Sequence, residues 1–550
     1  MTFYDKILSS LKEKLGIDNL ALEIPREKSF GDFATNIAMQ LAKTEHKSPR
    51  DIANTLLPKI QEIDFIESAD VAGAGFINIK IKNDFIINSL RTDSSIPKHS
   101  GIKIDFDYGA YNIAKDMHIG HLRTSIVGDT LYRVTKFLGN TPISYNHLGD
   151  WGRPMAMIIA WIVRTFPNDW NKSDFQVNAS DLNTFYPAAS AYAHEHPEFL
   201  EQVQNIKKEF QKGDNDYYKL YEKFSEISMA QMHSVVSRLN IVPFDNDLGE
   251  RNAAKYLEPV EKILRDKKLL IKSEGAEIVE LKRDDDAAPM PPFMFLDSRG
   301  ADTYDSTDLA ALYYRKITDN PDKIIYLTDA RQKLHFEQLF RVAEMSGIFP
   351  SENLEHQYFG AITGSDGKPF KTRDGNVATL TDIIDAVENA ARERAPNLPI
   401  ETIKMIAMAS LKFNDLMHDT KSDYVFDPNM VVQFDGRTGA YILYTVVRLN
   451  SALKKSDNRN FCSISNISND YERDLMIKIL DFPRMIETMF EKRAPDILAN
   501  YTYDLCQLAN TFYHNCEIKN DANRIAITQN AVKTLSTCID LMGMQIPKEM

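Results

Sequence analysis

The sequence predicts an α/β protein with two further domains: a parallel-sheet domain in the middle, a small α+β domain before it and an all-α helical bundle after it. Three observations support this prediction. Residues 1–98 mix helical and strand patterns, residues 99–399 alternate strands with helices, and residues 400–550 show amphipathic helical patterns without strand alternation. With 550 residues, the chain is long enough for several domains with separate cores.

The composition is that of an ordinary globular protein, with 43% hydrophobic and 26% charged residues. A net charge of −13 argues against nucleic-acid binding over the whole surface but is compatible with a local basic track for one structured RNA. The four cysteines form no Cys-x-x-Cys pair, so we expect free thiols in a reducing cytoplasm rather than two disulfides. Neither a targeting segment nor an apolar run near 18 residues is present, and we expect no membrane span.

The first domain is expected over residues 1–98. Apolar residues at helical spacing predict a helix over residues 4–15, and strands are expected at 20–24 and 75–81. The Gly73-x-Gly75 pair enters a strand rather than a helix, so we interpret it as a turn and not as a dinucleotide loop. A polar segment with Pro and Gly, residues 92–101, is typical of a linker.

The central domain is expected over residues 99–399. Strands and helices alternate in it, which predicts a parallel sheet with helical crossovers. The expected strands are residues 102–108, 143–146, 324–327 and 357–362, and the expected helices are residues 119–138, 155–165, 336–345 and 380–394. A long helical and charged stretch, about 175–272, separates the two halves. We therefore expect insertions at about residues 175–300 of one α/β domain.

The last domain is expected over residues 400–550. Its amphipathic patterns predict a helical bundle. The expected helices are residues 401–418, 436–454, 471–491, 493–513 and 524–543.

One stretch of the central domain carries the clearest chemical signal, because it leaves an expected strand and opens an expected helix. A helix start offers backbone N–H groups and a positive dipole end to an anion. His118 and His121 are three residues apart and share one face there, Lys115 precedes them, and Gly120 lets a flat ligand approach the backbone. This combination suits a phosphate. Two alternatives stay open: a zinc pair of the two histidines, and a helix start with incidental histidines.

Several motifs together resemble one family. His118-Ile-Gly-His121 after a strand resembles the first signature of class I aminoacyl-tRNA synthetases, and its surroundings resemble the arginyl-tRNA synthetase family. The segments that carry the resemblance, in chain order, are residues 30–39, 74–78, 112–115, 118–125, 146–152, 304–310, 367–375, 439–444 and 546–550. The resemblance implies a Rossmann-like catalytic domain, an N-terminal domain that touches the outer corner of the tRNA and an anticodon-binding bundle.

The resemblance also implies an activity: ATP-dependent ligation of arginine to tRNA through an arginyl-adenylate, with release of pyrophosphate and transfer to the 2′-hydroxyl of the terminal adenosine. The substrate guanidinium is planar, always charged and offers five donors, so a selective pocket needs carboxylates and a hydroxyl or ring. By resemblance, Asp107, Tyr304 and Asp308 hold the guanidinium, while Asn112 and Gln332 hold the α-amino and carboxylate end.

The ATP phosphates are expected to meet two groups of residues, and positioning with charge stabilisation carries the rate. His118, Gly120 and His121 serve from one side. By resemblance, Lys368, Lys371 and Arg373 serve from a Gly-flanked nucleotide loop. Mg²⁺ is expected to arrive with ATP as a substrate complex, and we expect no protein-bound metal.

The nucleotide loop departs from the class pattern Lys-Met-Ser-Lys-Ser. Aligned with residues 369–373, the second class lysine is Thr372; a register shifted by one residue, 368–372, keeps both lysines. Lys115, just before the first signature, is expected to compensate. Gly109 and Tyr111 stand where the family usually has Ser and Pro, which puts the rigidity of that loop in question, because Pro fixes φ.

For the RNA, the resemblance points to Arg437, Tyr441, Tyr444 and Arg448 along one C-terminal helix. Aromatic and arginine side chains can stack unpaired bases and hold phosphates, although simple helix packing is an equal alternative for the two tyrosines. Two other features are less specific. His194-Glu-His196 is interpreted as a surface loop rather than a metal clip, and Asp284-Asp-Asp286 as a solvated turn rather than a Mg²⁺ site.

We therefore expect a cytoplasmic, monomeric arginine–tRNA ligase whose partners are tRNA(Arg), arginine and ATP. Two rivals stay open. One is a tRNA-binding paralogue without catalysis, motivated by the altered loop before Asn112. The other is a nucleotidyltransferase for a small molecule, which would leave the helical bundle without a purpose. The intact His118, His121, Asp308 and Gln332 favour the enzyme.

Overall fold

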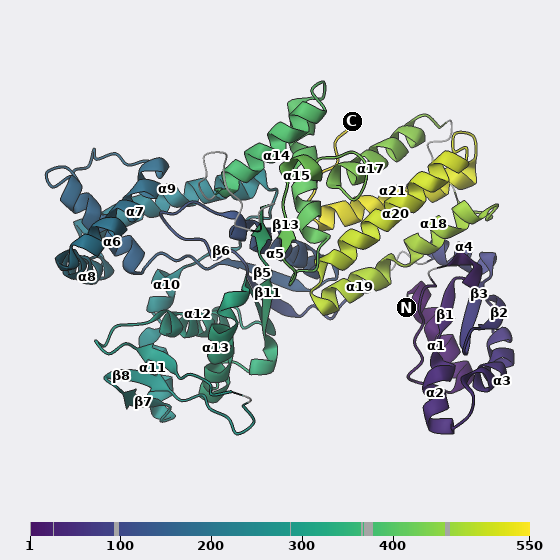
Figure 1. The fold of residues 1–550 in the computed structure, drawn as a ribbon, viewed down its shortest axis with the longest axis horizontal. Helices are drawn as coiled ribbons and strands as arrows, with labels where there is room; N and C mark the ends of the chain where they lie inside the picture. Colours follow the sequence, from purple (N-terminus) through teal and green to yellow (C-terminus); the bar gives the residue numbers. More distant parts are fainter. Residues whose placement is uncertain are drawn as a thin grey trace. The chain divides into compact units, whose positions relative to one another are not determined.

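The computed structural model describes residues 2–550 except 26, 93–97, 287, 365–366, 368–377 and 457–462. The chain divides into two compact units (Figure 1). The smaller unit comprises Met1–Lys98, Tyr441–Asp540 and Ile546–Met550, and the larger unit comprises His99–Ala440 and Leu541–Gln545. Among the described helices, none has both the length and the apolar composition that a membrane crossing requires.

A five-stranded sheet forms the centre of the larger unit, with strand order β11-β10-β4-β5-β6. Its strands are β4 (Lys103–Asp107), β5 (Thr141–Asn146), β6 (Asn246–Asp247), β10 (Lys323–Asp329) and β11 (Leu354–Phe359). All neighbouring strands are parallel, which confirms the predicted parallel sheet. β4 and β10 are buried over most of their length, as central strands covered on both faces require.

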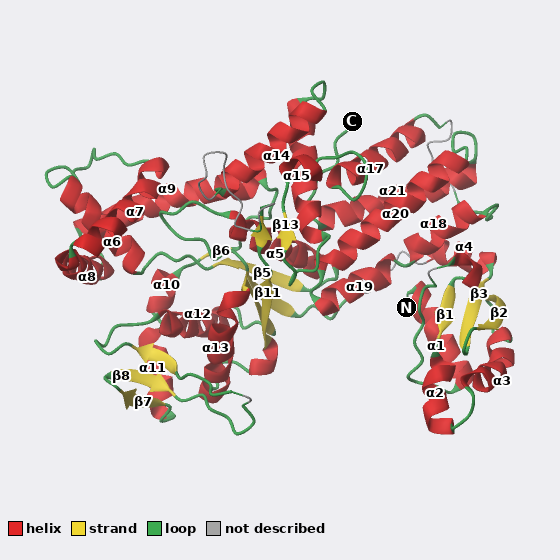
Figure 2. Ribbon diagram, in the orientation of Figure 1, coloured by secondary structure: helices red, strands yellow, loops and turns green. Residues whose placement is uncertain are grey.

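Helices pack on this sheet, and Figure 2 shows the yellow strands among them. The helices nearest the site are α5 (Ile119–Phe137), α6 (Arg153–Thr165), α12 (Tyr304–Thr318), α13 (Lys333–Ser346), α14 (Leu380–Arg394) and α15 (Ile400–Leu416). α5 and α15 are buried on nearly every side, so they belong to the core rather than to its surface. Residues 400–440, which include α15 and the short α16 (Pro428–Val431), lie in the larger unit.

The insertion between β5 and β10 begins with helices, as the sequence predicts, and ends with a small sheet. It contains α7 (Ala179–Glu195), α8 (Pro197–Gln211), α9 (Asp216–Arg238), α10 (Glu250–Ala254) and α11 (Leu257–Asp266). An antiparallel sheet follows, made of β7 (Leu270–Ser273), β8 (Ala276–Val279) and β9 (Phe293–Leu296). The mostly helical stretch expected over about residues 175–272 is confirmed, since α7 to α11 run from Ala179 to Asp266. The strands β7 to β9 after it were not predicted, because four-residue strands are too short for alternation to reveal them.

The N-terminal part of the smaller unit contains α1 (Phe3–Leu15), β1 (Phe33–Thr35), α2 (Ile37–Glu45), α3 (Pro49–Gln61), β2 (Ile66–Ala72), β3 (Phe76–Ile81) and α4 (Asn83–Thr92). Its antiparallel sheet has the order β1-β3-β2, and the predicted strand at 75–81 is its centre. The predicted strand at 20–24 was wrong. Glu23 forms only an isolated β-bridge to Ala34, and residues 20–24 do not form a strand.

The C-terminal part of the smaller unit is a helical bundle, as predicted. It contains α18 (Asp470–Leu480), α19 (Phe482–Lys492), α20 (Pro495–Asn515) and α21 (Ala522–Leu541), preceded by α17 (Gly439–Lys454) at the unit border. The single helix expected over 471–491 is two helices, because Pro483 starts a new helix after Asp481. Cys506, Cys516 and Cys538 are buried free thiols, and Cys462 lies outside the described residues.

After α21 the chain returns to the larger unit. The backbone carbonyl of Gly543 accepts hydrogen bonds from Lys412 Nζ at 2.9 Å and from Asn240 Nδ2 at 2.9 Å. Lys412 Nζ also lies 3.5 Å from Asp129 Oδ2 on α5. Burial lowers the pKa of Lys412 to about 8. The last residues of the chain are therefore part of the core contacts of α5 and α15.

Within the smaller unit, Arg473 of α18 is bound to the N-terminal sheet. Its Nη2 donates to Asp32 Oδ2 and to the Ile81 carbonyl, each at 2.6 Å, and its Nη1 donates to the Asn83 side chain. Burial raises the pKa of Asp32 even though Arg473 lies against it. The buried carboxylate therefore depends on the arginine as its counterion.

We expect Arg473→Met to lower the local free energy of unfolding by about 3 kcal/mol, because removing one partner leaves the other charge buried. Native-state hydrogen exchange of amides in β3 and α18 measures this. The matched control is Lys80→Met, which breaks an exposed 3.0 Å pair with Glu67 and should cost at most about 1 kcal/mol. Equal effects of the two substitutions would contradict the role of Arg473.

Candidate active site

The start of α5 is built by the two histidines of the His-x-Gly-His motif. His118 Nδ1 accepts a hydrogen bond from the Gly120 backbone N–H at 3.1 Å, and His121 Nδ1 accepts one from the His118 backbone N–H at 3.0 Å. Each neutral ring therefore carries its proton on Nε2. Burial lowers the pKa of His118 and lowers that of His121 to about 3. The pair consequently offers neutral N–H donors to an anion, and His118 is its exposed member.

The two rings stack with their centroids 4.0 Å apart. A Cβ atom at Gly120 would lie 2.9 Å from His118 Cε1, so only glycine leaves this ring in place. Among the described residues, no group of three or more His, Cys, Asp or Glu side chains is arranged to hold a metal ion.

The loop before α5 is anchored despite its departures from the family pattern. The hydroxyl of the buried Tyr111 lies 2.6 Å from Ser125 Oγ, and its ring packs edge-on against His121. A Cβ at Gly109 would collide with Asn146, 2.2 Å from its Oδ1. Tyr111 thus supplies by packing the rigidity that Pro would supply through φ. Asn112 remains exposed at the end of this anchored loop.

Lys115 lies in the same loop. Its Nζ is 4.5 Å from the centroid of the Tyr186 ring, and partial burial lowers the pKa of its amine. The charge of Lys115 also contributes to the lowered pKa of His118, which places both groups in one electrostatic neighbourhood. This arrangement can receive a phosphate.

Asp107 ends β4 and is paired with a buried cation. Arg315 of α12 donates from Nη2 to Asp107 Oδ2 at 2.5 Å, and the side chain of Arg315 is only 2% exposed. Its guanidinium lies between the rings of Tyr145 and Tyr326, at 4.4 and 5.3 Å. The contact therefore fixes the carboxylate at the carboxyl end of the strand, where parallel sheets place their ligand sites.

Asp105, two residues earlier on β4, is fully buried, and neither of its carboxylate oxygens has a hydrogen-bond partner among the described residues. Burial raises the pKa of Asp105 to about 8, and the positive charge of Arg315 opposes this shift. A group with this pKa is mostly protonated at neutral pH.

Asp308 lies on α12, one turn after Tyr304. Its Oδ2 is 2.7 Å from His335 Nε2, and its Oδ1 is 3.4 Å from His147 Nε2. Burial would raise the pKa of Asp308, but the hydrogen bond from His335 and the charges of His147, His335 and Arg315 lower it overall. The side chain of Tyr304 is 66% exposed, and its ring centroid lies 5.0 Å from that of His335.

Gln332 is the last residue of the short 3₁₀ helix η2 (Ala330–Gln332), directly after β10, and it is exposed. Its neighbour Arg331 contributes to the lowered pKa of His118, so η2 and the start of α5 share one electrostatic neighbourhood. The ends of β4 and β10 therefore present Asp107 and Gln332 at the same edge of the sheet.

Lys368, Lys371 and Arg373 of the nucleotide loop lie outside the described residues. The segments that flank this loop are described, and both meet α5. Before it, Arg123 of α5 donates to the Gly360 carbonyl at 3.0 Å. After it, the Leu380 N–H donates to the Met117 carbonyl at 2.7 Å. The loop thus starts and ends beside the helix that carries the histidine pair.

The four expected tRNA-contact residues lie in three different settings. The Arg448 guanidinium lies 4.6 Å from the ring of the exposed Tyr444 and 5.3 Å from that of Tyr513, a surface that could stack bases. Tyr441 accepts a hydrogen bond from Asn510 Nδ2 at 2.8 Å and is partly packed. Arg437 precedes α17 and lies in the larger unit. Tyr513 was not identified from the sequence, because it comes from another helix.

The His194–His196 and Asp284–Asp286 segments each contact neighbouring protein side chains. His196 Nδ1 is 3.1 Å from the exposed Glu198, and Asp286 is held by Arg341 at 2.6 Å. The hydrogen bond from Arg341 lowers the pKa of Asp286 to about 2.

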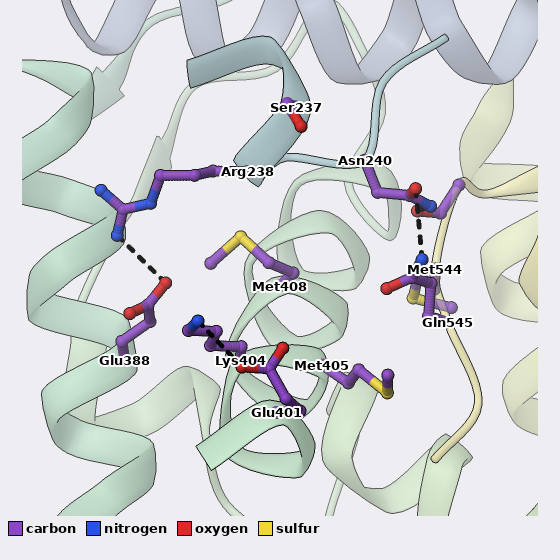
Figure 3. A pocket seen from close by; sticks show the side chains of 11 residues that line it. Ser237, Arg238, Asn240, Glu388, Glu401, Lys404, Met405, Met408, Met544 and Gln545 are labelled. Atoms are coloured by element: carbon purple, nitrogen blue, oxygen red, sulfur yellow. Dashed lines mark hydrogen bonds and ion pairs between the residues drawn. The ribbon is translucent and has the colours of Figure 1, made fainter. Parts of the chain in front are cut away.

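A separate cavity of about 560 Å³ lies among α9, α14, α15 and residues 543–545 (Figure 3). Its polar groups are paired with one another: Arg238 with Glu388 at 3.0 Å, Lys404 with Glu401 at 3.1 Å, and Gln545 with Asn240 at 3.4 Å. Within the described part of the chain, none of the expected site residues lines it.

Sequence reasoning missed His147, Arg315 and His335. His147 lies inside the 146–152 motif, but the sequence does not show that its side chain points toward Asp308. Arg315 and His335 lie seven residues after Asp308 and three after Gln332, and helical spacing could have placed both near the pocket.

Three family models match the chain. Residues 86–428 match "tRNA synthetases class I (R), catalytic domain", residues 442–550 match "DALR anticodon binding domain", and residues 3–81 match "Arginyl tRNA synthetase N terminal domain". The first match alone covers more than half of the 550 residues.

Relatives match over nearly the full length. The chain is 35% identical over 553 residues to the arginine–tRNA ligase of Alkaliphilus oremlandii, covering 94% of each chain. It is 33% identical over 584 residues to that of Francisella tularensis subsp. tularensis, covering 100% of this chain and 99% of the relative.

Solved structures match as well. The arginyl-tRNA synthetase of Plasmodium falciparum superposes with a TM-score of 0.83 and 25% identity, covering 100% of this chain and 98% of the other. That of Thermus thermophilus has a TM-score of 0.81 at 22% identity, covering 100% and 99%, and supports the fold.

We expect Asp105→Asn to stabilise the larger unit increasingly as pH rises from 5 to 8. The folded-state pKa of Asp105, about 8, exceeds its ordinary 3.8, so the folded state keeps a proton that the unfolded state has lost. Wild-type stability therefore falls across this range, by up to about 1.4 kcal/mol per pH unit, and the asparagine variant lacks this loss.

Urea unfolding followed by tryptophan fluorescence measures this difference, because all three tryptophans, Trp151, Trp161 and Trp170, lie in the larger unit. A difference between variant and wild type that stays constant from pH 5 to 8 would show that Asp105 is ionised throughout.

Proposed function

The chain belongs to the arginyl-tRNA synthetase family, and from this premise we propose that it charges tRNA(Arg) with arginine at the expense of ATP. One observation carries the proposal: the start of α5 with its histidine pair, the carboxylate of Asp107 and the Asp308 side chain with its two histidine contacts belong to the carboxyl end of one parallel sheet. That edge is where open α/β sheets bind their ligands.

The guanidinium of arginine is bound by Asp107 and Asp308, with the exposed ring of Tyr304 beside them. In each carboxylate one oxygen is held by an internal cation, and we propose the other as the acceptor for the substrate; in Asp308 this oxygen lies 3.4 Å from His147 Nε2. Asn112 and Gln332, both exposed, hold the α-amino and carboxylate end of the substrate. Lysine would satisfy this arrangement poorly, because its ammonium is a point charge rather than a planar fork.

In the first step, an oxygen of the arginine carboxylate attacks the α-phosphorus of ATP. The new O–P bond forms as the bond to the bridging oxygen breaks, and pyrophosphate leaves with its electrons. The His118 Nε2–H and Lys115 stabilise the charge on the phosphates. His121 holds the backbone of His118 in place, Gly120 permits the close approach, and Lys368, Lys371 and Arg373 act from the nucleotide loop. Mg²⁺ enters with ATP, as part of the substrate complex.

In the second step, the 2′-hydroxyl of the terminal adenosine attacks the arginyl carbonyl, and AMP leaves. Tyr441, Tyr444 and Arg448 contact the RNA from α17, Arg437 does so from the segment before this helix, and the N-terminal domain touches the outer corner of the RNA. We propose a monomer. We also propose a cytoplasmic location, which suits the buried free thiols of Cys506 and Cys538.

The first test is arginine-dependent exchange of pyrophosphate into ATP, with and without a total tRNA pool. We expect exchange that requires arginine and tRNA, because the family resembles the few synthetases that need tRNA for activation. Charging of tRNA should follow under the same conditions. Protein that binds tRNA but never exchanges pyrophosphate would instead be a non-catalytic paralogue, and exchange indifferent to tRNA would favour a small-molecule nucleotidyltransferase.

The second test is Asp308→Asn, which keeps the shape of the side chain and removes its charge. We expect kcat/KM for arginine to fall about 100-fold, the loss of one charged hydrogen bond, with KM for ATP unchanged. The control is Asp385→Asn, an exposed carboxylate that pairs with Arg238 at 2.6 Å. Unchanged kcat/KM for arginine in the Asp308 variant would refute the pocket assignment.

A further inference from the structure

His335 of α13 is not part of the mechanism above, yet both of its ring nitrogens face carboxylates. Nδ1 lies 3.0 Å from Asp305 Oδ1, and Nε2 lies 2.7 Å from Asp308 Oδ2. An ionised carboxylate can only accept a hydrogen bond, and a neutral imidazole carries only one N–H. Two such contacts therefore call for the doubly protonated imidazolium form of His335.

The other groups around His335 agree with this charge state. Burial would lower the pKa of His335, but the hydrogen bonds and charges of Asp305 and Asp308 raise it to about 9. His356 of β11 has its pKa lowered to about 4 by burial and by the positive His335, so it is neutral. Tyr304 packs its ring against that of His335, and His147 contacts the other oxygen of Asp308. Glu250 interacts electrostatically with both His147 and Asp308, and the charge of Lys333 adds to the lowering of the pKa of His356.

The charge balance of the pocket depends on this imidazolium. Asp107, Asp305 and Asp308 contribute three negative charges, and Arg315 and His335 contribute two positive charges. The five groups together leave one negative charge, which a single guanidinium neutralises. Without the charge on His335, the pocket would carry a surplus negative charge, and the Asp308 carboxylate would lose the contact that orients it.

We propose that His335 is the positioning residue of the arginine site: its imidazolium ties Asp308 to Asp305 and holds Oδ2 of Asp308, so that Oδ1, which lies 3.4 Å from His147 Nε2, is the oxygen offered to the substrate guanidinium. The inference rests on the proposed function, which places Asp308 at the guanidinium. Asp107 at the end of β4 is held in the same way, because Arg315 binds one of its carboxylate oxygens. His335 differs in that it can lose its charge within an accessible pH range.

Two substitutions separate the two contacts of His335. The amide nitrogen of His335→Gln can take the place of Nε2 and still donate to Asp308, whereas that of His335→Asn takes the place of Nδ1 and donates only to Asp305. We expect KM for arginine to rise about tenfold in the Asn variant and less than about threefold in the Gln variant, with KM for ATP unchanged in both. The matched control is His196→Gln, which replaces an exposed histidine 3.1 Å from Glu198.

The critical result is which of the two variants has the larger rise in KM for arginine. A purely structural histidine would give similar losses in both variants, spread over kcat and every KM, and that outcome would overturn the proposal. The effect of pH follows from the raised pKa: the orienting contact is complete below pH 8 and is lost as pH rises through about 9. The ratio of wild-type to His335→Asn kcat/KM should therefore fall above pH 9. Titration of the substrate amine affects both proteins equally and cancels in this ratio.

A spectroscopic measurement tests the charge state without any turnover. In ¹⁵N-histidine NMR spectra, the resonance missing from His335→Gln should titrate near pH 9, and a titration near pH 6.5 would overturn the proposal. Wild-type protein that never exchanges pyrophosphate with arginine and tRNA would refute the proposed function itself. A wild type that does so, with KM for arginine unchanged in both His335 variants, would refute the role of His335 alone.

Discussion

The geometry of the site depends on one buried guanidinium. Arg123 points from α5 into the core and donates to the carbonyls of Gly360, Asp419 and Ser422, while its Nε lies 3.2 Å from Asp415. These acceptors lie 237 to 299 residues away in the sequence, so one side chain joins α5 to the segment before the nucleotide loop and to the segment after α15. Burial makes each contact strong and each loss costly, because an unpaired carbonyl or charge in the core has no water to replace its partner.

The pocket shows how a protein can bind a cation with carboxylates that it has already paired. A bare cluster of buried acids would shift toward the protonated form, as the Asp105 carboxyl does, and would then bind a guanidinium weakly. Pairing with an internal cation keeps Asp308 ionised and fixes one of its oxygens. Recognition then depends on the directions of the remaining oxygens, which suits a planar substrate with forked donors better than a spherical charge.

The fold class could be predicted from sequence because its signals are local: the helix at 380–394 begins at a capping box, and the middle of β10, residues 324–327, is a continuous apolar run. The short strands β7 to β9 gave no comparable signal, and the two-residue strand β13 (Tyr424–Val425) exists only through pairing with β12 (Ile362–Thr363). In the site, motifs identified the groups proposed to touch substrate. His147, Arg315 and Tyr513 could not be assigned in this way, because their roles come from contacts with residues far away in the chain.

The return of the chain at Gly543 has a consequence for biosynthesis. Lys412 is buried in the larger unit, and one of its acceptors is a backbone carbonyl that the ribosome adds 131 residues later. Until Gly543 has been added, that ammonium lacks the contact, and α5 and α15 are packed around an incompletely satisfied charge. The larger unit therefore cannot reach its final form domain by domain from the N-terminus. Its core is completed only after helices α18 to α21 and Gly543 have been made, so the final packing of the larger unit waits for the synthesis of a segment that belongs to the other unit.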